Sequence, residues 1–285
     1  MQRKQGIIEL GRRLVEHGPK RTLEAARRVR AIHNHTVIAD TTKGVYVWEH
    51  DFYPAIYVPQ KDLINSKLSD KEEIRVEGKG LASLAELIVS AHDGLEEVKV
   101  ENVLRFDNDK KLGALAGLLR IEFGSIGMTF EEEIGCCKQA DIRKDQWLEE
   151  DAPIYVHPKD PFKRVDILPS QRPIEVQVNG KTVAKASSSM HLFETGLPTR
   201  YYLPLGAIDQ SVLRKSDLKT KCPYKGEAEY YHVVVDGQEM KNLAWYYRLP
   251  THESAAIAGL VCFYNEKVDT ILDGEPQPRP KTHFA

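Results

Sequence analysis

An internal duplication is the feature that most constrains the fold of this chain. The segment RRVRAIHNHTVIADTTKGVYVWEHDFYPAIYVP, which begins at Arg27, aligns without a gap with RPIEVQVNGKTVAKASSSMHLFETGLPTRYYLP, which begins at Arg172. Identical residues stand at Arg27/Arg172, Asn34/Asn179, Ala39/Ala184, Glu49/Glu194, Tyr57/Tyr202 and Pro59/Pro204. With small gaps the match continues as far as Leu118 in the first copy and Leu260 in the second. A collinear series of this length indicates a tandem repeat, which must be recognised before any other prediction of the fold.

Each copy has the pattern of a mainly β domain with short helices (α+β). Runs such as GVYVWEH, IEVQVNGKTVAKA and LVCFY are rich in β-branched and aromatic residues and alternate with Asn-Gly, Lys-Gly and Asp-Gly turns. One short helix is expected near the end of each copy, capped by Asp107 or Asn108 in the first and by Thr251 in the second. Residues 7–28 have helical spacing that Gly18-Pro19 interrupts.

These patterns predict a domain order. We expect an N-terminal helical segment at 1–26, a first, diverged repeat at 27–130, an acidic and Pro-rich bridge without counterpart in the repeat at 131–171, a second repeat at 172–274 and a tail at 275–285.

Composition excludes several classes of protein. The 285 residues include 40 basic and 42 acidic side chains, so the balance of charge does not predict a nucleic-acid partner. No apolar run approaches the ~20 residues that span a bilayer, and the first residues lack the apolar core of a signal peptide. Four cysteines in a chain of this length favour a reduced, cytoplasmic protein. We expect a monomer or homodimer that does not bind membranes.

The second copy resembles the domain of unknown function 427 family over about one hundred residues. The resemblance rests on the blocks Thr220-Lys221-Cys222-Pro223-Tyr224-Lys225-Gly226 and Ala244-Trp245-Tyr246-Tyr247 and on Tyr201-Tyr202-Leu203-Pro204. The first copy departs from the pattern, because Val76-Glu77 stands in place of the Cys-Pro pair. The resemblance implies two tandem domains of strongly bent antiparallel sheet, of the β-tent kind that methionine sulfoxide reductase B and several zinc modules also have. The two-copy form with the bridge PIYVHPKDPFKRVDIL is similar to fungal members.

The family is sometimes labelled nucleotidyltransferase-like, and the residues do not favour that chemistry. Nucleotidyl transfer needs paired carboxylates that hold Mg²⁺ against a triphosphate. The only Asp-x-Asp sequence is Asp107-Asn108-Asp109, where a helix cap is expected instead. Paired C-x-x-C zinc knuckles are also absent from the sequence. We therefore expect no metal site and no cofactor.

Glu49 and Glu194 are the acids retained at one repeat position, and Tyr57 and Tyr202 follow eight residues later. A carboxylate held among aromatic rings is suited to acid–base chemistry, so we expect Glu49, Glu194 and Tyr202 to be catalytic. The alternative is that each Glu accepts hydrogen bonds from backbone amides and fixes a bend in the sheet.

Cys222 lies three residues before Lys225. A nearby ammonium favours a thiolate, so a thiol-dependent redox role is an alternative, against a turn in which Cys222 is only a small apolar residue.

The bridge carries the last candidate residues. Two prolines stiffen the segment around His157 and Arg164, which could line a pocket or only strap the repeats together. We expect His157 to be catalytic, and we expect the substrate-binding residues to be Trp245, Tyr230, Lys225, Arg164, Tyr57 and Trp48.

The leading hypothesis is a metal-independent enzyme that acts on a small molecule in an aromatic-lined pocket. A lyase, cyclase, isomerase or hydrolase step fits Glu, Tyr and His chemistry, and the fungal resemblance suggests specialised metabolism. The alternatives are a non-catalytic module that binds a ligand or protein, and a thiol redox enzyme.

Overall fold

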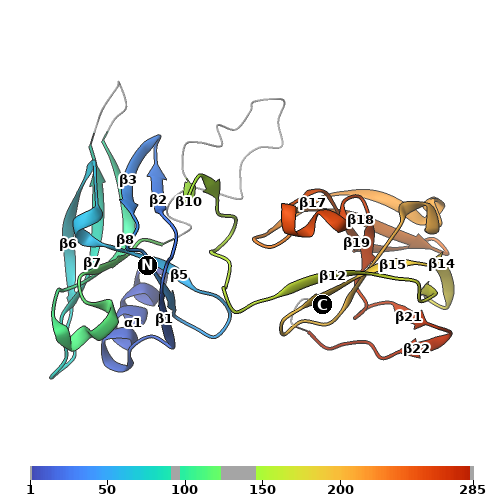
Figure 1. Ribbon diagram of the computed structural model, residues 1–285, viewed down its shortest axis with the longest axis horizontal. Helices are drawn as coiled ribbons and strands as arrows, with labels where there is room; N and C mark the ends of the chain where they lie inside the picture. The colour runs from blue at the N-terminus through green and yellow to red at the C-terminus, as the bar shows by residue number, and fades with distance from the viewer. Residues whose placement is uncertain (1, 91–96, 123–145, 283–285) are drawn as a thin grey trace. The chain divides into compact units, whose positions relative to one another are not determined.

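The computed structural model describes residues 2–90, 97–122 and 146–282 (Figure 1). The chain divides into two compact units, unit 1 over residues 1–158 and unit 2 over residues 159–285. Each unit contains one seven-stranded and one four-stranded antiparallel sheet. The prediction of a mainly β protein with two tandem domains is therefore confirmed.

The seven-stranded sheet of unit 1 has the order β1-β4-β5-β9-β8-β7-β6, and the four-stranded sheet has the order β11-β10-β2-β3. The strands of the larger sheet are β1 (Arg21–Glu24), β4 (Val45–Trp48), β5 (Ala55–Pro59), β6 (Ser66–Ile74), β7 (Ala82–Val89), β8 (Val98–Phe106) and β9 (Leu118–Arg120). Those of the smaller sheet are β2 (Val29–His33), β3 (Thr36–Thr41), β10 (Gln146–Glu149) and β11 (Ala152–Pro153). Register shifts between β6 and β7 and between β7 and β8 are the β-bulges that bend the larger sheet.

Unit 2 repeats this order strand for strand. Its larger sheet runs β12-β15-β16-β20-β19-β18-β17 and its smaller sheet β14-β13-β21-β22. The larger sheet consists of β12 (Val165–Ser170), β15 (Ser189–Glu194), β16 (Arg200–Leu203), β17 (Leu213–Cys222), β18 (Gly226–Val235), β19 (Gln238–Pro250) and β20 (Val261–Phe263). The smaller sheet consists of β13 (Ile174–Val178), β14 (Lys181–Ala186), β21 (Asp269–Leu272) and β22 (Glu275–Gln277). Identical strand order over two sheets is independent support for the duplication.

The segments predicted as bridge and tail take part in these sheets. β10 pairs with β2 and β11 with β10, just as β21 pairs with β13 and β22 with β21. Residues 146–153 of the bridge therefore have a counterpart in the second repeat, contrary to the expectation that the bridge has none. β12, also from the predicted bridge, pairs with β15 in unit 2.

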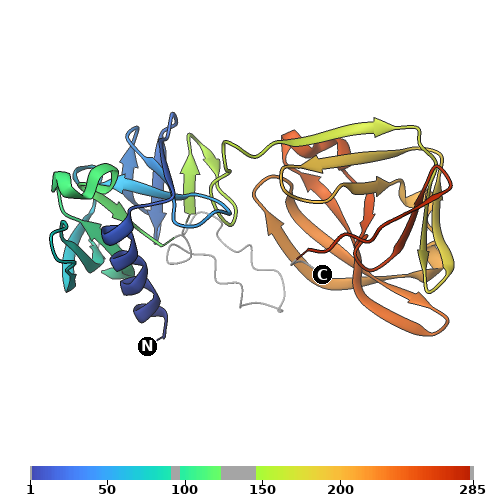
Figure 2. The same cartoon turned by 90° about the horizontal axis from the view of Figure 1, so that it is seen from below.

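One α-helix, α1 (Gln2–His17), lies along a face of the larger sheet in unit 1 (Figure 2). It ends where predicted, because Gly18 takes the left-handed conformation with φ +73° and Pro19 follows. Ile7, Leu14 and Val15 bury one side of the helix against β6, β7 and β8. A Cβ atom on Gly11 would lie only 2.7 Å from Ile74 Cδ1, so the helix approaches the sheet closely at this glycine.

The other helical turns of the described residues are short 3-10 segments: η1 (Gln60–Asp62), η2 (Lys110–Leu115), η4 (Leu205–Ala207), η5 (Gln210–Val212) and η6 (His252–Ile257). η2 and η6 stand where short helices were predicted. The cap of η2 is Asp109, whose carboxylate accepts from Lys111 N, and not Asp107 or Asn108. Thr251 occupies the N-cap position of η6, but its hydroxyl donates to Tyr224 O instead of capping the turn.

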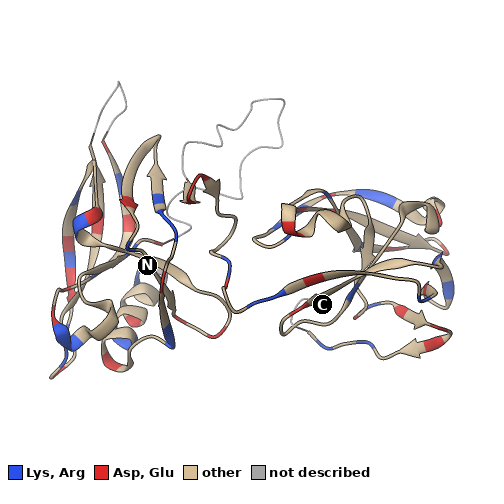
Figure 3. Cartoon of the chain, viewed as in Figure 1, with Lys and Arg blue, Asp and Glu red and all other residues tan. Residues whose placement is uncertain are grey.

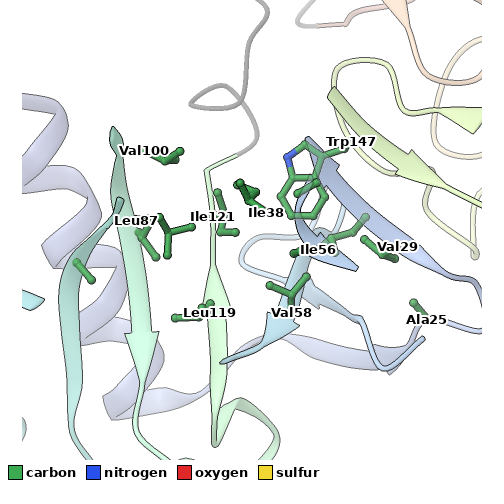
Figure 4. Packing of buried hydrophobic residues seen from close by; sticks show 14 of the residues in the cluster. Ala25, Val29, Ile38, Ile56, Val58, Leu87, Val100, Leu119, Ile121 and Trp147 are labelled. Carbon is green, nitrogen blue, oxygen red and sulfur yellow. The ribbon is translucent and has the colours of Figure 1, made fainter. Parts of the chain in front are cut away.

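The main core of each unit lies between its two sheets. In unit 1, Val29, Ile38 and Trp147 from the smaller sheet face Leu87 and Leu119 from the larger one (Figure 4). A second apolar cluster covers the other face of each larger sheet, and in unit 1 this cluster includes α1. Charged residues follow the outer strand β6 (Figure 3), which protects an exposed sheet edge from pairing with other chains.

Candidate functional site

The strand registers show which residues of the two repeats correspond. Tyr57 of β5 lies opposite Arg120 of β9, and Tyr202 of β16 lies opposite Cys262 of β20. Arg120 in the first repeat therefore occupies the position of Cys262 in the second. The gapless alignment likewise places Ala55 at the position of Arg200.

Glu49 forms a buried ion pair in the first repeat. Arg120 Nε lies 2.6 Å from Glu49 Oε1 and Arg120 Nη2 lies 3.2 Å from Oε2, while Tyr57 Oη donates to Oε1 at 3.2 Å. The side chains of Glu49 and Arg120 are only 10% and 12% exposed. Burial and the neighbouring Glu49 carboxylate raise the pKa of Tyr57 well above its ordinary value, so this phenol stays protonated.

Arg120 has one unused donor. Its Nη1 is buried and has no hydrogen-bond acceptor among the residues that the structure describes. Burial opposes the charge of Arg120, but the hydrogen bond and the charge of Glu49 still raise its pKa, so the guanidinium is always charged. A buried N–H without an acceptor costs about 1–3 kcal/mol, which an oxygen from a ligand or water would recover.

Glu49 and Arg120 line a pocket of about 190 Å³ in unit 1. The other lining residues are His50, Tyr53, Pro54, Ala55, Ile56, Ile121, Glu122, Val156, His157 and Pro158. Glu49 comes from the end of β4 and His157 from the segment that follows β11, so the fold joins residues more than one hundred positions apart. Two of the predicted catalytic residues therefore line one pocket.

Two histidines of the pocket have opposite hydrogen-bonding states. His157 Nδ1 lies 2.7 Å from Pro158 O, and because a carbonyl only accepts, this nitrogen carries a proton, which places the lone pair of the neutral ring on Nε2. His50 Nδ1 accepts from Phe52 N at 3.3 Å, which places the proton of the neutral ring on Nε2. Tyr53 stacks on His157 at 3.9 Å between ring centroids and meets His50 edge-on at 4.5 Å.

The second repeat fills the corresponding position with a long side chain. Arg200, at the position of Ala55, forms two 2.6 Å hydrogen bonds with the carboxylate of Glu266 and lies over the rings of Trp245 and Tyr264. A small side chain at residue 55 leaves room that Arg200 occupies in unit 2. In the second repeat the side chain of Arg200 therefore takes up the space next to the corresponding strand.

Glu194 has a different partner in the second repeat. Lys225 Nζ donates to Glu194 Oε2 at 2.5 Å, and the two side chains are 12% and 6% exposed. Burial works against the ammonium, but its interactions with Cys222 and Glu194 raise the pKa of Lys225 overall. Cys222 is half-buried at the end of β17, opposite Gly226.

The predicted aromatic residues of the second repeat form one cluster on the larger sheet. Tyr202 is fully buried, and its hydroxyl accepts from Trp245 Nε1 at 3.2 Å, while the carboxylate of Glu194 accepts from Lys225. Tyr230 Oη lies 2.8 Å from Thr220 Oγ1. The structure therefore brings together Glu49 with Tyr57 in the first repeat, but it does not bring together Glu194 with Tyr202 in the second.

Two predicted binding residues lie elsewhere. Trp48 is buried in the core between the sheets, beneath the guanidinium of Arg21. Arg164 is 81% exposed and pairs with Asp166. Within the described residues, no backbone amide donates to the carboxylates of Glu49 and Glu194. An arginine binds the first carboxylate and a lysine binds the second.

Sequence reasoning missed Arg120, His50 and Tyr53. Arg120 ends an apolar strand, and Cys262 stands at its position in the second copy. Comparison of the two repeats therefore could not identify Arg120 as a candidate site residue. His50 and Tyr53 lie in the aromatic-rich loop WEHDFYP, whose composition could have indicated a pocket wall.

The fold and the two polar clusters define a class: a tandem-duplicated, antiparallel β protein in which the glutamate at the repeated position of each copy forms a buried ion pair. A family model described as domain of unknown function (DUF427) matches residues 21–120 and 166–274, most of the chain. The chain belongs to this family in a two-copy form. A search of curated proteins finds no match, and no helix in the described part of the chain is long and apolar enough to cross a membrane.

Proposed function

We propose that the protein is an enzyme that moves a proton within a small ring-containing substrate in the pocket of unit 1. The observation that carries the proposal is that Glu49, Arg120, His50 and His157 line one pocket. Small-molecule sites are concave and combine apolar walls with placed polar groups, and this pocket joins apolar residues such as Ile56 and Ile121 to an equal number of polar or charged ones.

The two histidines supply an acid and a base. In their neutral forms His157 has its lone pair on Nε2 and His50 has its proton on Nε2, so the first ring is suited to take a proton and the second to give one. This pairing fits an isomerisation or an elimination next to a carbonyl group, in which a C–H proton leaves and a proton returns at another atom. Neither step requires an external oxidant or reductant.

Arg120 is suited to hold the oxygen of the substrate. Its buried Nη1 lacks an acceptor among the described residues, and a carbonyl or carboxylate oxygen fits a guanidinium N–H. Glu49 has both oxygens bound, by Arg120 and Tyr57. We therefore assign Glu49 and Tyr57 to positioning Arg120 and assign proton transfer to the histidines.

The volume limits the substrate. About 190 Å³ equals the liquid volume of about six water molecules at ~30 Å³ each. A single ring with one or two substituents matches this space, and stacked Tyr53 and His157 offer an aromatic wall. The resemblance to fungal members supports a place in fungal specialised metabolism, and the low cysteine content supports a cytoplasmic location.

Binding is tested with benzoate and cyclohexanone as probes, by saturation-transfer NMR. Ala55→Phe fills the pocket and is expected to abolish binding, whereas Leu249→Phe adds the same ring at an 81% exposed site in unit 2 and is expected to leave binding intact. Equal binding by the two variants would contradict the location of the site.

Catalysis is tested by following exchange of the α-hydrogens of cyclohexanone in D₂O. The full chain is expected to accelerate exchange, and His157→Asn is expected to remove this acceleration while benzoate still binds. Binding without any acceleration would favour the alternative, a non-catalytic ligand-binding module.

A further inference from the structure

The charged side chains around the pocket of unit 1 restrict the ligand that the pocket can hold. Glu49, Arg120 and Glu122 are the acidic and basic residues of its lining in the described part of the chain, apart from the two histidines. Glu49 and Arg120 already form a two-point ion pair, with N···O distances of 2.6 and 3.2 Å, so their charges largely cancel. With both histidines neutral, the carboxylate of Glu122 leaves the lining with a net negative charge.

A carboxylate is a poor partner for this lining. A ligand carboxylate that accepts from Arg120 Nη1 would enter beside two protein carboxylates, those of Glu49 and Glu122. The guanidinium would attract it weakly, because Glu49 already neutralises Arg120. Like charges repel more strongly away from bulk water, and the side chains of this ion pair are only 10% and 12% exposed. The pocket therefore favours an oxygen acceptor that carries no charge.

A cation is a poor partner for a different reason. The Nη1 group of Arg120 is a buried donor without an acceptor among the described residues. A cationic ligand with only N–H groups would leave this donor unsatisfied and would place a second positive charge beside the guanidinium. The net charge of the lining alone therefore does not define the ligand.

Glu122 can accept a hydrogen bond from the same ligand that Arg120 binds. Residues two positions apart in an extended chain point to the same side, and Arg120 and Glu122 both line the pocket. A carboxylate has about four acceptor sites, so it can accept from a ligand N–H in addition to its other interactions. A donor and an acceptor side by side match the C=O and N–H that leave adjacent atoms of an amide.

We propose that the pocket of unit 1 takes an uncharged ring compound that carries an amide. Its carbonyl oxygen accepts from Arg120 Nη1, and its N–H donates to the carboxylate of Glu122. Glu122 determines specificity, because it receives the N–H and repels carboxylates. Tyr53, stacked on His157, provides an aromatic surface for the planar ring. This inference rests on the proposed function, whose substrate class it narrows to amides.

The experiment compares benzamide, benzoate and benzamidine, three probes of nearly the same shape. At neutral pH benzamide is uncharged and has both an acceptor and a donor, benzoate is an anion with acceptors only, and benzamidine is a cation with donors only. Dissociation constants for the full-length protein are measured by saturation-transfer NMR titration. We expect benzamide to bind about tenfold more tightly than either charged probe, and Ala55→Phe to abolish its binding.

The variant that tests the specificity is Glu122→Gln, which removes the charge and keeps the size and an acceptor oxygen. It is expected to bind benzoate about tenfold more tightly than the wild type does, with the affinity for benzamide within about threefold. The matched control is Glu77→Gln, the same substitution at an exposed residue of unit 1 outside the pocket lining. This control is expected to leave both affinities unchanged.

Two results would overturn the inference and leave the proposed function standing. One is benzoate or benzamidine binding to the wild type as tightly as benzamide. The other is an unchanged affinity for benzoate in Glu122→Gln while benzamide still binds. If Glu122→Gln binds none of the probes, Glu122→Asp decides, because it keeps the charge and must keep the preference for benzamide over benzoate.

The same titrations also test the site itself. Failure of all three probes to bind the wild type, or benzamide binding that Ala55→Phe does not reduce, would contradict the location of the site. That outcome would overturn the proposed function together with this inference.

Discussion

The buried pair between Glu49 and Arg120 gives the sharpest test of how the pocket of unit 1 is held together. Arg120→Met keeps the apolar part of the side chain but leaves the Glu49 carboxylate, only 10% exposed, without its cation. Removing one member of a buried ion pair costs about 3–5 kcal/mol, because the remaining charge is still desolvated. We expect that loss for Arg120→Met and a similar loss for Glu49→Gln, which strands the guanidinium.

The double variant Arg120→Met/Glu49→Gln is expected to recover most of this stability. Glutamine keeps an acceptor oxygen for Tyr57 Oη, and methionine removes the buried Nη1 that has no acceptor among the described residues. Replacing a complete buried pair by neutral groups is often neutral or stabilising. The double variant should therefore lie within about 1 kcal/mol of the wild type, far from the sum of the two single losses.

The assay is urea unfolding followed by tryptophan fluorescence in a Trp245→Phe background. The two remaining tryptophans, Trp48 and Trp147, are both buried in the core of unit 1, so the signal reports that unit. A loss of 3–5 kcal/mol corresponds to about 10 °C in melting temperature for a unit of this size. A loss below about 1 kcal/mol for Arg120→Met, or additive losses in the double variant, would refute the reasoning.

Three further predictions concern stability. Burial opposes the charge of the Glu266 carboxylate, but the hydrogen bonds from Arg200 and Thr282 lower its pKa from 4.5 to about 2. The ionised carboxylate therefore stabilises unit 2 above about pH 4.5, and this contribution is lost as the pH falls toward 2. Melting curves from pH 7 to 2 should show this decline, and Glu266→Gln should be less stable at neutral pH and nearly flat over the acidic range. Trp147→Ala removes a fully buried side chain of β10 and should cost about 3–5 kcal/mol in the unfolding of unit 1, whereas no effect would show that residues 146–153 are not part of its core. Gly226→Ala should destabilise unit 2 by about 1–3 kcal/mol, because residue 226 has φ +97° and its Cβ would lie 3.3 Å from Leu249 O. Amide hydrogen exchange in β17 and β18 measures this loss, and unchanged protection of these strands would contradict the prediction.

The duplication was visible in the sequence because the two copies keep identical residues at aligned positions, such as Asn34/Asn179 and Tyr57/Tyr202. Alternating apolar residues and Gly turns in each copy predicted the mainly β fold, and Gly18-Pro19 predicted the end of α1. The counterpart of β10 and β11 was not visible, because the strand residues QWLE and DTIL share no identity although they pair with corresponding strands. Strand pairing is satisfied by backbone atoms, so register can persist where side chains do not.

The chemistry of the sites was only partly predictable, for a related reason. The repeat identified Glu49 and Glu194, but their cations come from different elements, Arg120 on β9 and Lys225 at the turn between β17 and β18. A carboxylate needs a buried cation near it, and the fold offers more than one place from which to supply it. Alignment of the repeats detects the glutamate, which stands at one position in both copies. It misses the cation, because the cation stands at a different position in each copy.

The two repeats differ in a complementary way that bears on why both are kept. In the first, α1 covers the outer face of the larger sheet, while Ala55 leaves a pocket beside Glu49. In the second, Arg200 occupies the place of Ala55, and the corresponding face of the larger sheet carries Tyr230, Trp245 and Tyr247. If both repeats served only as structural domains, both faces could be apolar and both ion pairs could be the same. Each repeat has instead changed its polar groups at a different point of one fold. Replacement of Cys222 in unit 2 should therefore leave ligand binding by the pocket of unit 1 unchanged.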